Sequence, residues 1–370
     1  MRNVGTLSVA RRNMMAGKAR TAFSVAGVAV ATLLLLFVVG LYRGWNEELV
    51  TYIRETPADV WVVGNTADSF FTPSLVFNTT VLDIQQIKGI KQTSSLVGRP
   101  IKLRMGDEGW DTYLLGFDAA GAGGPVAMKE GKAIPETGEI IIDDVLARTS
   151  GIEIGDEVRA GLRRLKVVGV SEGGNLVLAQ LSFVSIEEAR LLAGDAAVNF
   201  VLVKTDPGQA ATVIERLNTS LPGVHAFSAA TFGDNSQRVL RRSILPILLV
   251  IVLMAVLVGV IVVGLTVYTA AIEKEREFGI LKALGVPAPG LLRVVFEQSL
   301  TCGALGFVLG VMLTFVASWL AGLAIPQVVT LVRWQDIALV ALATAVMSII
   351  ASIIPMQRIV RVHTLSVFKA

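Results

Sequence analysis

The stretch EKEREFGILKALG, residues 273–285, places six charged side chains between two of the longest uncharged runs of the chain. The preceding run covers residues 243–272, and the following run covers residues 298–332. Each run is long enough to cross a hydrocarbon core of about 30 Å as an α-helix. We therefore expect a short charged helix between two membrane spans.

The composition is that of an integral membrane protein with a water-exposed part. Of the 370 residues, 53% are hydrophobic and 17% are charged, whereas a soluble domain carries about 25% charged residues. Residues 42–242 hold 20 Lys+Arg and 25 Asp+Glu, and the rest of the chain holds 13 and 5. Positive charge therefore accompanies the apolar segments, so the basic pI gives no support for a nucleic-acid partner. The single cysteine, Cys302, excludes an internal disulfide.

Four apolar segments are predicted to be transmembrane helices. Residues 21–42 are longer than the roughly 7–15-residue apolar region of a cleavable signal, so we interpret them as a retained signal anchor. The other spans are expected at residues 243–272, 291–323 and 337–357. Residues 1–20 are expected to form a cytoplasmic amphipathic helix; a basic flank that only sets the topology is the alternative.

The second span is too long for the bilayer alone. As one helix, residues 243–272 would extend about 45 Å. The outer turns are therefore expected to project as a stalk, continued outward by Arg238, Arg241 and Arg242. Pro246 is expected to mark a kink near the outer boundary.

Lysine and arginine in the short loops predict the orientation. Residues 1–20, the 273–293 loop and the tail at 358–370 are rich in these residues, whereas the 324–336 loop carries only Arg333. The positive-inside rule therefore places both termini and the charged stretch in the cytoplasm, with 324–336 as a short outer loop.

Residues 43–242 are predicted to form one large extracytoplasmic α+β domain inserted between the first two spans. Short apolar runs closed by Gly, Pro or Asp are typical of strands, and their irregular alternation with helices favours α+β over a doubly wound sheet. The Gly-rich residues 116–124 are interpreted as a boundary between two subdomains. Strands are expected at 60–63, 101–104, 113–116, 139–142, 157–159, 165–170, 181–184 and 200–204, and helices at 81–87, 144–149, 186–193 and 208–221.

No catalytic, metal-binding or cofactor-binding residue is predicted in this chain. The phosphate-binding pattern Gly-x-x-x-x-Gly-Lys-Ser/Thr is absent. The two histidines, His225 and His363, are expected on opposite sides of the membrane, which excludes a shared metal or a catalytic triad. The acidic pairs at 143–144 and 187–188 are interpreted as helix-start or solvated residues.

The third span carries one acidic residue and a run of small residues. Glu297 is expected to pair with Arg293, one turn away, at the membrane boundary. Gly303, Gly306 and Gly310 are candidate helix-packing residues, because glycines at this spacing allow close helix contact. Packing against a second copy of the chain is one use of this face.

Residues 273–287 are predicted to form a short cytoplasmic coupling helix that docks on a partner. Gly285 can end the helix, and a proline lies two residues beyond it, within a break at 286–290. Phe278, Leu281 and Leu284 can form an apolar ridge beside the charged side chains. A topogenic charged loop is the alternative, but such a loop requires only basic residues.

This motif closely resembles the cytoplasmic coupling helix of the FtsX/MacB-type ABC transporter permeases, also called type VII or mechanotransmission ABC proteins. Residues 13–28 resemble the first span of that family, residues 355–365 resemble its closing segment, and residues 138–169 are similar to its periplasmic domain. One span, a large outer domain and three further spans match the family order over essentially the whole chain. The resemblance implies that the following residues contact the ATPase: Glu273, Arg276, Glu277, Phe278, Gly279, Lys282 and Gly285.

The same resemblance implies the partners. A dimeric permease, expected as a homodimer, would pair with two copies of a separate ABC ATP-binding subunit that holds ATP and Mg²⁺. A membrane-fusion protein or another extracytoplasmic protein is a further candidate partner, and membrane lipid surrounds the spans. The expected location is a bacterial cytoplasmic (inner) membrane.

Two functions remain open at this point. The first is a non-catalytic permease that exports an amphiphilic substrate, or extracts it from the membrane, the substrate being a lipid, lipoprotein or peptide. The second is a non-transport signal transmitter that controls an extracytoplasmic cell-wall enzyme. A stand-alone membrane sensor is a third reading, and an intramembrane enzyme is disfavoured because no span carries a credible catalytic pair.

Overall fold

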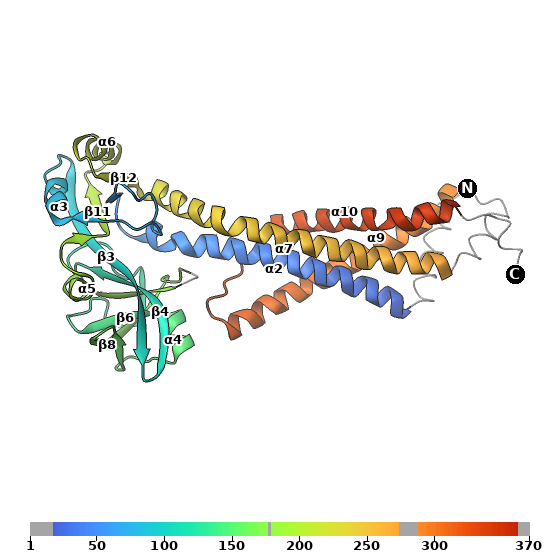
Figure 1. Ribbon diagram of the computed structural model, residues 1–370, viewed down its shortest axis with the longest axis horizontal. Coiled ribbons are helices and arrows are strands. Elements are labelled where there is room, and N and C mark those ends of the chain that lie inside the picture. Colours follow the sequence, from blue (N-terminus) through green and yellow to red (C-terminus); the bar gives the residue numbers. More distant parts are fainter. Residues whose placement is uncertain (1–17, 177–178, 274–287, 362–370) are drawn as a thin grey trace, which may run out of the picture. The chain divides into compact units, whose positions relative to one another are not determined.

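The computed structural model describes residues 18–176, 179–273 and 288–361 (Figure 1). By their internal contacts, the residues group into two units. The helical unit comprises Met1–Arg43, Pro246–Leu323 and Thr330–Ala370. The sheet unit comprises Gly44–Leu245 together with the short segment Ala324–Val329.

Four long helices in the described residues contain all four predicted spans. They are α2 (Lys18–Glu55), α7 (Ala229–Glu273), α9 (Ala288–Ala324) and α10 (Trp334–Arg361). Each contains a segment long and apolar enough to cross a membrane: Thr21–Glu55, Arg241–Val262, Phe296–Ala324 and Trp334–Ile353. Leu35 and Leu36 of α2 are buried together with Ala255 of α7 and Val340 of α10. These three helices therefore share an apolar cluster.

The helices extend beyond the predicted spans. α2 continues to Glu55, past the charged residues that follow the apolar run. α7 begins at Ala229, so the outward continuation of the second span is helical, and Pro246 lies inside the helix. α9 begins at Ala288 rather than at 291, because proline at position 289 is tolerated in the first turn of a helix. α10 likewise continues to Arg361.

The sheet unit contains a mixed ten-stranded sheet in the order β12-β1-β11-β3-β4-β9-β6-β8-β5, with β7 pairing β3 and β8. The pairs β4–β9 and β6–β8 are parallel, and the other pairs are antiparallel. The strands are β1 (Val60–Gly64), β3 (Ile90–Met105), β4 (Glu108–Phe117), β5 (Ala127–Gly131), β6 (Glu139–Asp143), β7 (Glu157–Ala160), β8 (Arg163–Glu172), β9 (Gln180–Ser185), β11 (Phe200–Thr205) and β12 (Val224–Ser228).

A separate two-stranded sheet joins β2 (Val76–Phe77) and β10 (Ala197–Val198). The shorter helices are α3 (Asn78–Gln85), α4 (Asp144–Ser150), α5 (Ile186–Ala193) and α6 (Ala210–Ser220), of which α6 lies beside β12 (Figure 1). All eight predicted strands and all four predicted short helices are present. One sheet contains strands on both sides of residues 116–124, so the expected subdomain boundary there does not divide it.

Apolar side chains are buried on both faces of the large sheet, as strand β1 illustrates. Successive side chains of a strand point to opposite faces, and in β1 Val60 and Val62 belong to one apolar cluster while Trp61 and Val63 belong to the other. The first cluster also contains residues of the short helices α3 to α6. The second contains residues of α2 and α7, the two long helices.

A partly buried ion pair joins β8 to α5. Glu188 is fully buried, and both its carboxylate oxygens accept hydrogen bonds of 2.7 Å from the Arg163 guanidinium. The Gly138 amide donates a third bond of 3.0 Å. Bonding to Arg163 is the main reason that the pKa of Glu188 lies below its ordinary value. Glu188 is therefore not a solvated residue, although it does lie in the first turn of α5.

Arg163→Ala should lower the free energy of unfolding of the intact protein in detergent at pH 7 by about 1–3 kcal/mol, because Glu188 would lose its charged partner. A lowered pKa stabilises the folded state above the unfolded value of about 4.3. The difference between variant and wild type should therefore shrink as pH falls through the folded pKa. Chemical denaturation followed by tryptophan fluorescence measures both effects.

The neighbouring change Arg164→Ala is the control, since its ion pair with Glu157 is long, 3.9 Å, and exposed. Equal destabilisation by both changes would contradict the assignment of the ion pair.

Candidate functional site

Most of the predicted coupling segment lies outside the described residues. Glu273 is the last residue of α7. Arg276, Glu277, Phe278, Gly279, Lys282 and Gly285 are not described. Their contact with an ATPase therefore stays a prediction. The described part of the site is α7, which leads into this segment, and the elements that pack against α7.

Aromatic side chains bury the other end of α7 in the sheet unit. Phe232, in the first turns of α7, stacks on Trp61 of β1 with ring centroids 5.1 Å apart. Phe70 stacks on Phe200 of β11 at 5.0 Å, and Tyr52 of α2 lies edge-on to Trp61 at 6.3 Å. All five side chains are at most 2% exposed. We call this group, Tyr52, Trp61, Phe70, Phe200 and Phe232, the aromatic junction.

Hydrogen bonds fasten both helices to the aromatic junction. The Tyr52 hydroxyl donates to the Gly123 carbonyl at 2.6 Å, which ties α2 to the Gly-rich loop. The Phe70 amide donates to Ser236 Oγ at 3.0 Å, and the Ser236 hydroxyl donates to the Phe232 carbonyl at 2.8 Å. Displacement of either helix against the sheet would therefore break buried packing and buried hydrogen bonds together.

The two helices are also bonded to each other within the sheet unit. Gln237 Nε2 donates to the Asn46 carbonyl at 2.8 Å. Arg54 and Asp234 form an exposed ion pair of 3.6 Å, which contributes little. The aromatic junction and the Gln237 bond make α2 and α7 one mechanical element at this end.

The small residues of α9 pack inside the chain. A Cβ atom at Gly306 would lie 2.5 Å from Val28 Cβ of α2, and one at Gly310 would lie 2.6 Å from Thr32 Cβ. A Cβ atom at Gly303 would collide with the Ser348 hydroxyl of α10. These glycines thus let α9 approach α2 and α10 closely, as close contacts between membrane helices require.

An ion pair joins Arg43, within α2, to the start of α10 in the helical unit. Arg43 Nη2 lies 2.6 Å from Asp336 Oδ1, and the Asp336 side chain is 4% exposed. The Arg333 amide donates to Asp336 Oδ2 at 3.0 Å, as in a capping box at the start of a helix. The Leu331 amide donates to the Gly40 carbonyl at 2.9 Å.

Glu297 pairs with Arg293 at 2.9 Å within α9, as the sequence predicted.

Several buried hydroxyls of the helical unit are bonded to helix backbone. Ser299 donates to the Ser348 carbonyl at 2.8 Å, Ser348 to the Thr344 carbonyl at 2.9 Å, and Thr314 to the Gly310 carbonyl at 2.8 Å. Thr32 and Thr344 hydroxyls face each other at 3.4 Å. The hydrogen-bonding groups of these hydroxyls are therefore paired with helix carbonyls or with each other, as in helix–helix contacts within membranes.

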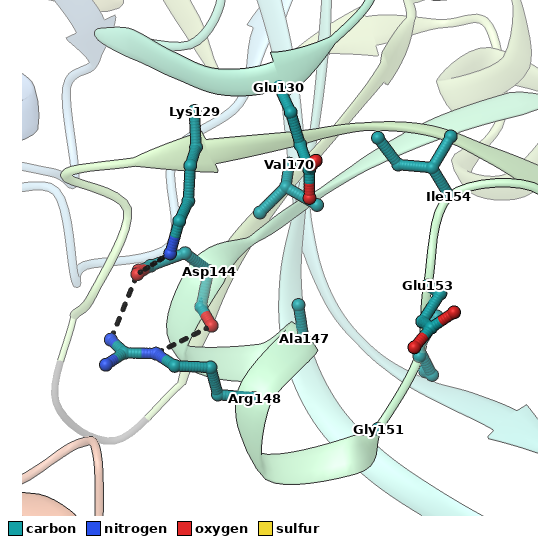
Figure 2. Close-up of a pocket in the computed structure, with 10 residues that line it drawn as sticks. Lys129, Glu130, Asp144, Ala147, Arg148, Gly151, Glu153, Ile154 and Val170 are labelled. Carbon is teal, nitrogen blue, oxygen red and sulfur yellow. Dashed lines mark hydrogen bonds and ion pairs between the residues drawn. The ribbon is translucent and has the colours of Figure 1, made fainter.

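The sheet unit has a polar cavity of about 490 Å³ beside α4 (Figure 2). Asp144 binds Lys129 at 3.4 Å and Arg148 at 3.0 Å, and Glu130 and Glu153 line other parts of the wall. None of the residues that line it is a Ser, Thr, Cys or His. Outside the cavity wall, Asp143 caps α4 by accepting a hydrogen bond from the Val145 amide at 3.0 Å, as predicted for a helix-start residue. The cavity therefore offers charge pairs and no hydroxyl, thiol or imidazole group.

In the described part of the chain, no group of three or more His, Cys, Asp or Glu side chains could hold a metal ion.

Two protein-family models match this combination of long apolar helices and a mixed sheet. Residues 21–220 match the MacB-like periplasmic core domain, and residues 249–364 match the FtsX-like permease C-terminal region. The first match alone covers more than half of the chain. The chain belongs to the MacB/FtsX-type family of ABC transporter permeases. The family is generally non-catalytic, and membership implies an ATP-binding partner subunit.

Three relatives named ABC transporter permeases agree with this assignment, and one solved structure is similar over part of the chain. Two uncharacterised ABC transporter permeases of Mycobacterium tuberculosis are each 26% identical, over 361 and 366 residues; the alignments cover 96% and 98% of this chain and 97% and 99% of the relatives. An uncharacterised ABC transporter permease of Methanocaldococcus jannaschii is 27% identical over 46% of each chain. The solved periplasmic region of MacB from Actinobacillus actinomycetemcomitans is 13% identical, with a TM-score of 0.38, over 49% of this chain and 94% of its own.

Gly306→Val should lower the thermal stability of the intact permease in detergent. The added side chain would meet Val28 and the Val25 carbonyl of α2, and overpacking of this kind costs about 1–3 kcal/mol. Gly322→Val, in the same helix, is the matched control because nothing lies within 4 Å of its added Cβ. An unchanged unfolding temperature for Gly306→Val would contradict the close contact between α9 and α2.

Proposed function

We propose that the chain is the permease subunit of an ABC transporter that transmits ATP-driven motion to its own sheet unit. A separate ATPase, in two copies, would bind the 273–285 segment on the cytoplasmic side of a bacterial inner membrane. The permease would act as a homodimer with both termini in the cytoplasm. Motion of the extracytoplasmic sheet unit would then export an amphiphilic substrate or extract it from the membrane.

The continuity of α7 is the observation that carries this proposal. The helix has 45 residues, so it extends about 67 Å. Phe232 and Ser236, near its start, belong to the core of the sheet unit, and Glu273, at its end, opens the predicted coupling segment. A helix transmits a displacement along its length, whereas a flexible linker does not. Pro246 removes one backbone hydrogen bond of α7 without ending the helix.

The packing of the helical unit supports mechanical work over passage of a solute through the bilayer. The buried hydroxyls named above bond to helix carbonyls or to each other. A polar route would instead leave polar groups lining a water-filled path. Transmission to an amphiphile at the outer face needs no such route.

Glu277→Lys combined with Phe278→Ala should abolish co-purification of the ATPase subunit while the permease still inserts into the membrane. The double change reverses one charge and removes the apolar ridge residue that we assign to docking. Affinity purification from native membranes measures the loss. Glu275→Lys reverses a charge in the same segment at a position not assigned to contact, and it should leave co-purification intact. Retention of the ATPase by the double variant would refute the docking role.

Replacing Arg241 and Arg242 by glycine should uncouple the two ends of α7. Each glycine weakens a helix interior by about 1 kcal/mol relative to alanine, and both arginines are exposed. The ATPase should still co-purify, but ATP-dependent release of a labelled amphiphile from proteoliposomes should fall. The matched variant with two alanines removes the same charges and should keep both activities.

Equal release by the glycine and alanine variants would contradict transmission through α7. ATPase stimulation without release of any amphiphile by the wild-type protein would favour the alternative, a transmitter that controls an extracytoplasmic enzyme.

A further inference from the structure

A second cavity of the sheet unit has a different chemistry from the polar one. Its volume is about 460 Å³, within the range of about 300–1,000 Å³ typical of small-molecule sites. Trp45 of α2 and Trp110 of β4 line it, together with the aliphatic side chains Leu146, Ile325 and Val328. Ligand pockets combine such an apolar wall with a few polar groups that fix orientation. We call this cavity the tryptophan pocket.

One side-chain amide lies in this mostly apolar wall. Gln180 lines the tryptophan pocket and is 5% exposed. Its backbone pairs with β4 and its carbonyl accepts from Thr112, but its side-chain amide makes no hydrogen bond with any described residue. A ligand with an ester or amide group in the pocket can hydrogen-bond to this amide, as the few polar groups of a mostly apolar pocket do.

The charge of the wall selects against anions. The one charged residue that lines the tryptophan pocket is Asp111, whose side chain is 76% exposed and pairs with Lys102 at 3.7 Å. No lysine, arginine or histidine is among the lining residues. A phosphate or carboxylate inside the pocket would therefore find no cation among the lining residues, whereas an uncharged polar group needs none.

The chain itself links this pocket to the membrane helices. Trp45 follows Arg43, the last residue of the helical unit on α2, by two positions. Ile325 and Val328 lie in the segment that joins α9 to α10, and Gln327 Nε2 of that segment donates to Thr149 Oγ1 of α4 at 3.4 Å. Tryptophan is enriched where proteins meet the membrane surface. A molecule leaving the outer leaflet is thus the ligand most readily supplied to these walls.

We propose that the tryptophan pocket binds the acyl chain of an uncharged, single-chain amphiphile, with the Gln180 side chain hydrogen-bonded to its ester or amide linkage. The apolar wall would hold the chain and the exposed rim near Asp111 would face the polar head. This inference rests on the proposed function only for the use of the site, in which the amphiphile is the molecule that the permease moves.

The test uses the full chain in phosphatidylcholine nanodiscs and a monoacylglycerol that carries a photoactivatable group in its acyl chain. After irradiation, peptide mapping should find label on segments with Trp45, Trp110 or residues 325–328. The fatty acid with the same chain should label these segments about tenfold less, because its carboxylate has no cation in the wall. Label confined to the apolar helices, or equal labelling by the two probes, would overturn the proposal.

Variants separate binding from folding. Val328→Asp places a charge in the tryptophan pocket and should cut labelling about tenfold. Ile154→Asp, in the polar cavity of the same unit, should leave labelling unchanged. Gln180→Leu should keep the chain bound but remove the preference for the ester probe over an alkane of equal length. Wild-type labelling by Val328→Asp, or an unchanged preference in Gln180→Leu, would overturn the proposal.

ATPase co-purification gives an independent readout. Labelling without ATPase binding would refute the proposed function and leave the pocket standing, whereas ATPase binding without labelling would refute the pocket alone.

Discussion

The stacking of Phe232 on Trp61 is the contact on which the rest of the architecture depends. Trp61 lies in β1, which pairs with β11 and β12 and is buried on both faces. Phe232 belongs to α7, and Tyr52 of α2 packs edge-on to the same tryptophan. Aromatic pairs of this geometry add about 0.5–1.5 kcal/mol each beyond their area burial. Several of them acting together hold the end of α2 and the start of α7 against the sheet.

The helical unit reaches rigidity by a different route. In lipid there is little hydrophobic gain in bringing two apolar helices together, so close backbone approach and internal hydrogen bonds replace it. Gly306 and Gly310 allow this approach between α9 and α2, and the Ser299 hydroxyl adds a hydrogen bond from α9 to α10. Packing of aromatic rings therefore stabilises the sheet unit, whereas glycines that permit close helix contact stabilise the helical unit.

Local sequence patterns predicted the helices and strands of this fold, but they did not predict contacts between residues far apart in the chain. The apolar runs of β1 and β11 identify buried strands, and uncharged length identifies the spans, because both signals are contained in a few neighbouring residues. α2 continues past Arg43 because charge ends a hydrophobic run without ending a helix. β5 was missed because its side chains are largely exposed and show no alternation. The Arg43–Asp336 pair, 293 residues apart, and the Gly306 contact with α2 depend on the folded arrangement.

The single cysteine gives the molecule a useful experimental property. Cys302 is 1% exposed, next to Gly303, where α9 meets α10. A thiol so deeply packed reacts slowly with polar reagents, so the natural chain has a nearly silent background for maleimide chemistry. Pairs of introduced cysteines carrying spin labels or fluorophores could therefore report distances along α7 during turnover without first removing a native residue. The permease is in this respect already prepared for direct observation of its own movement.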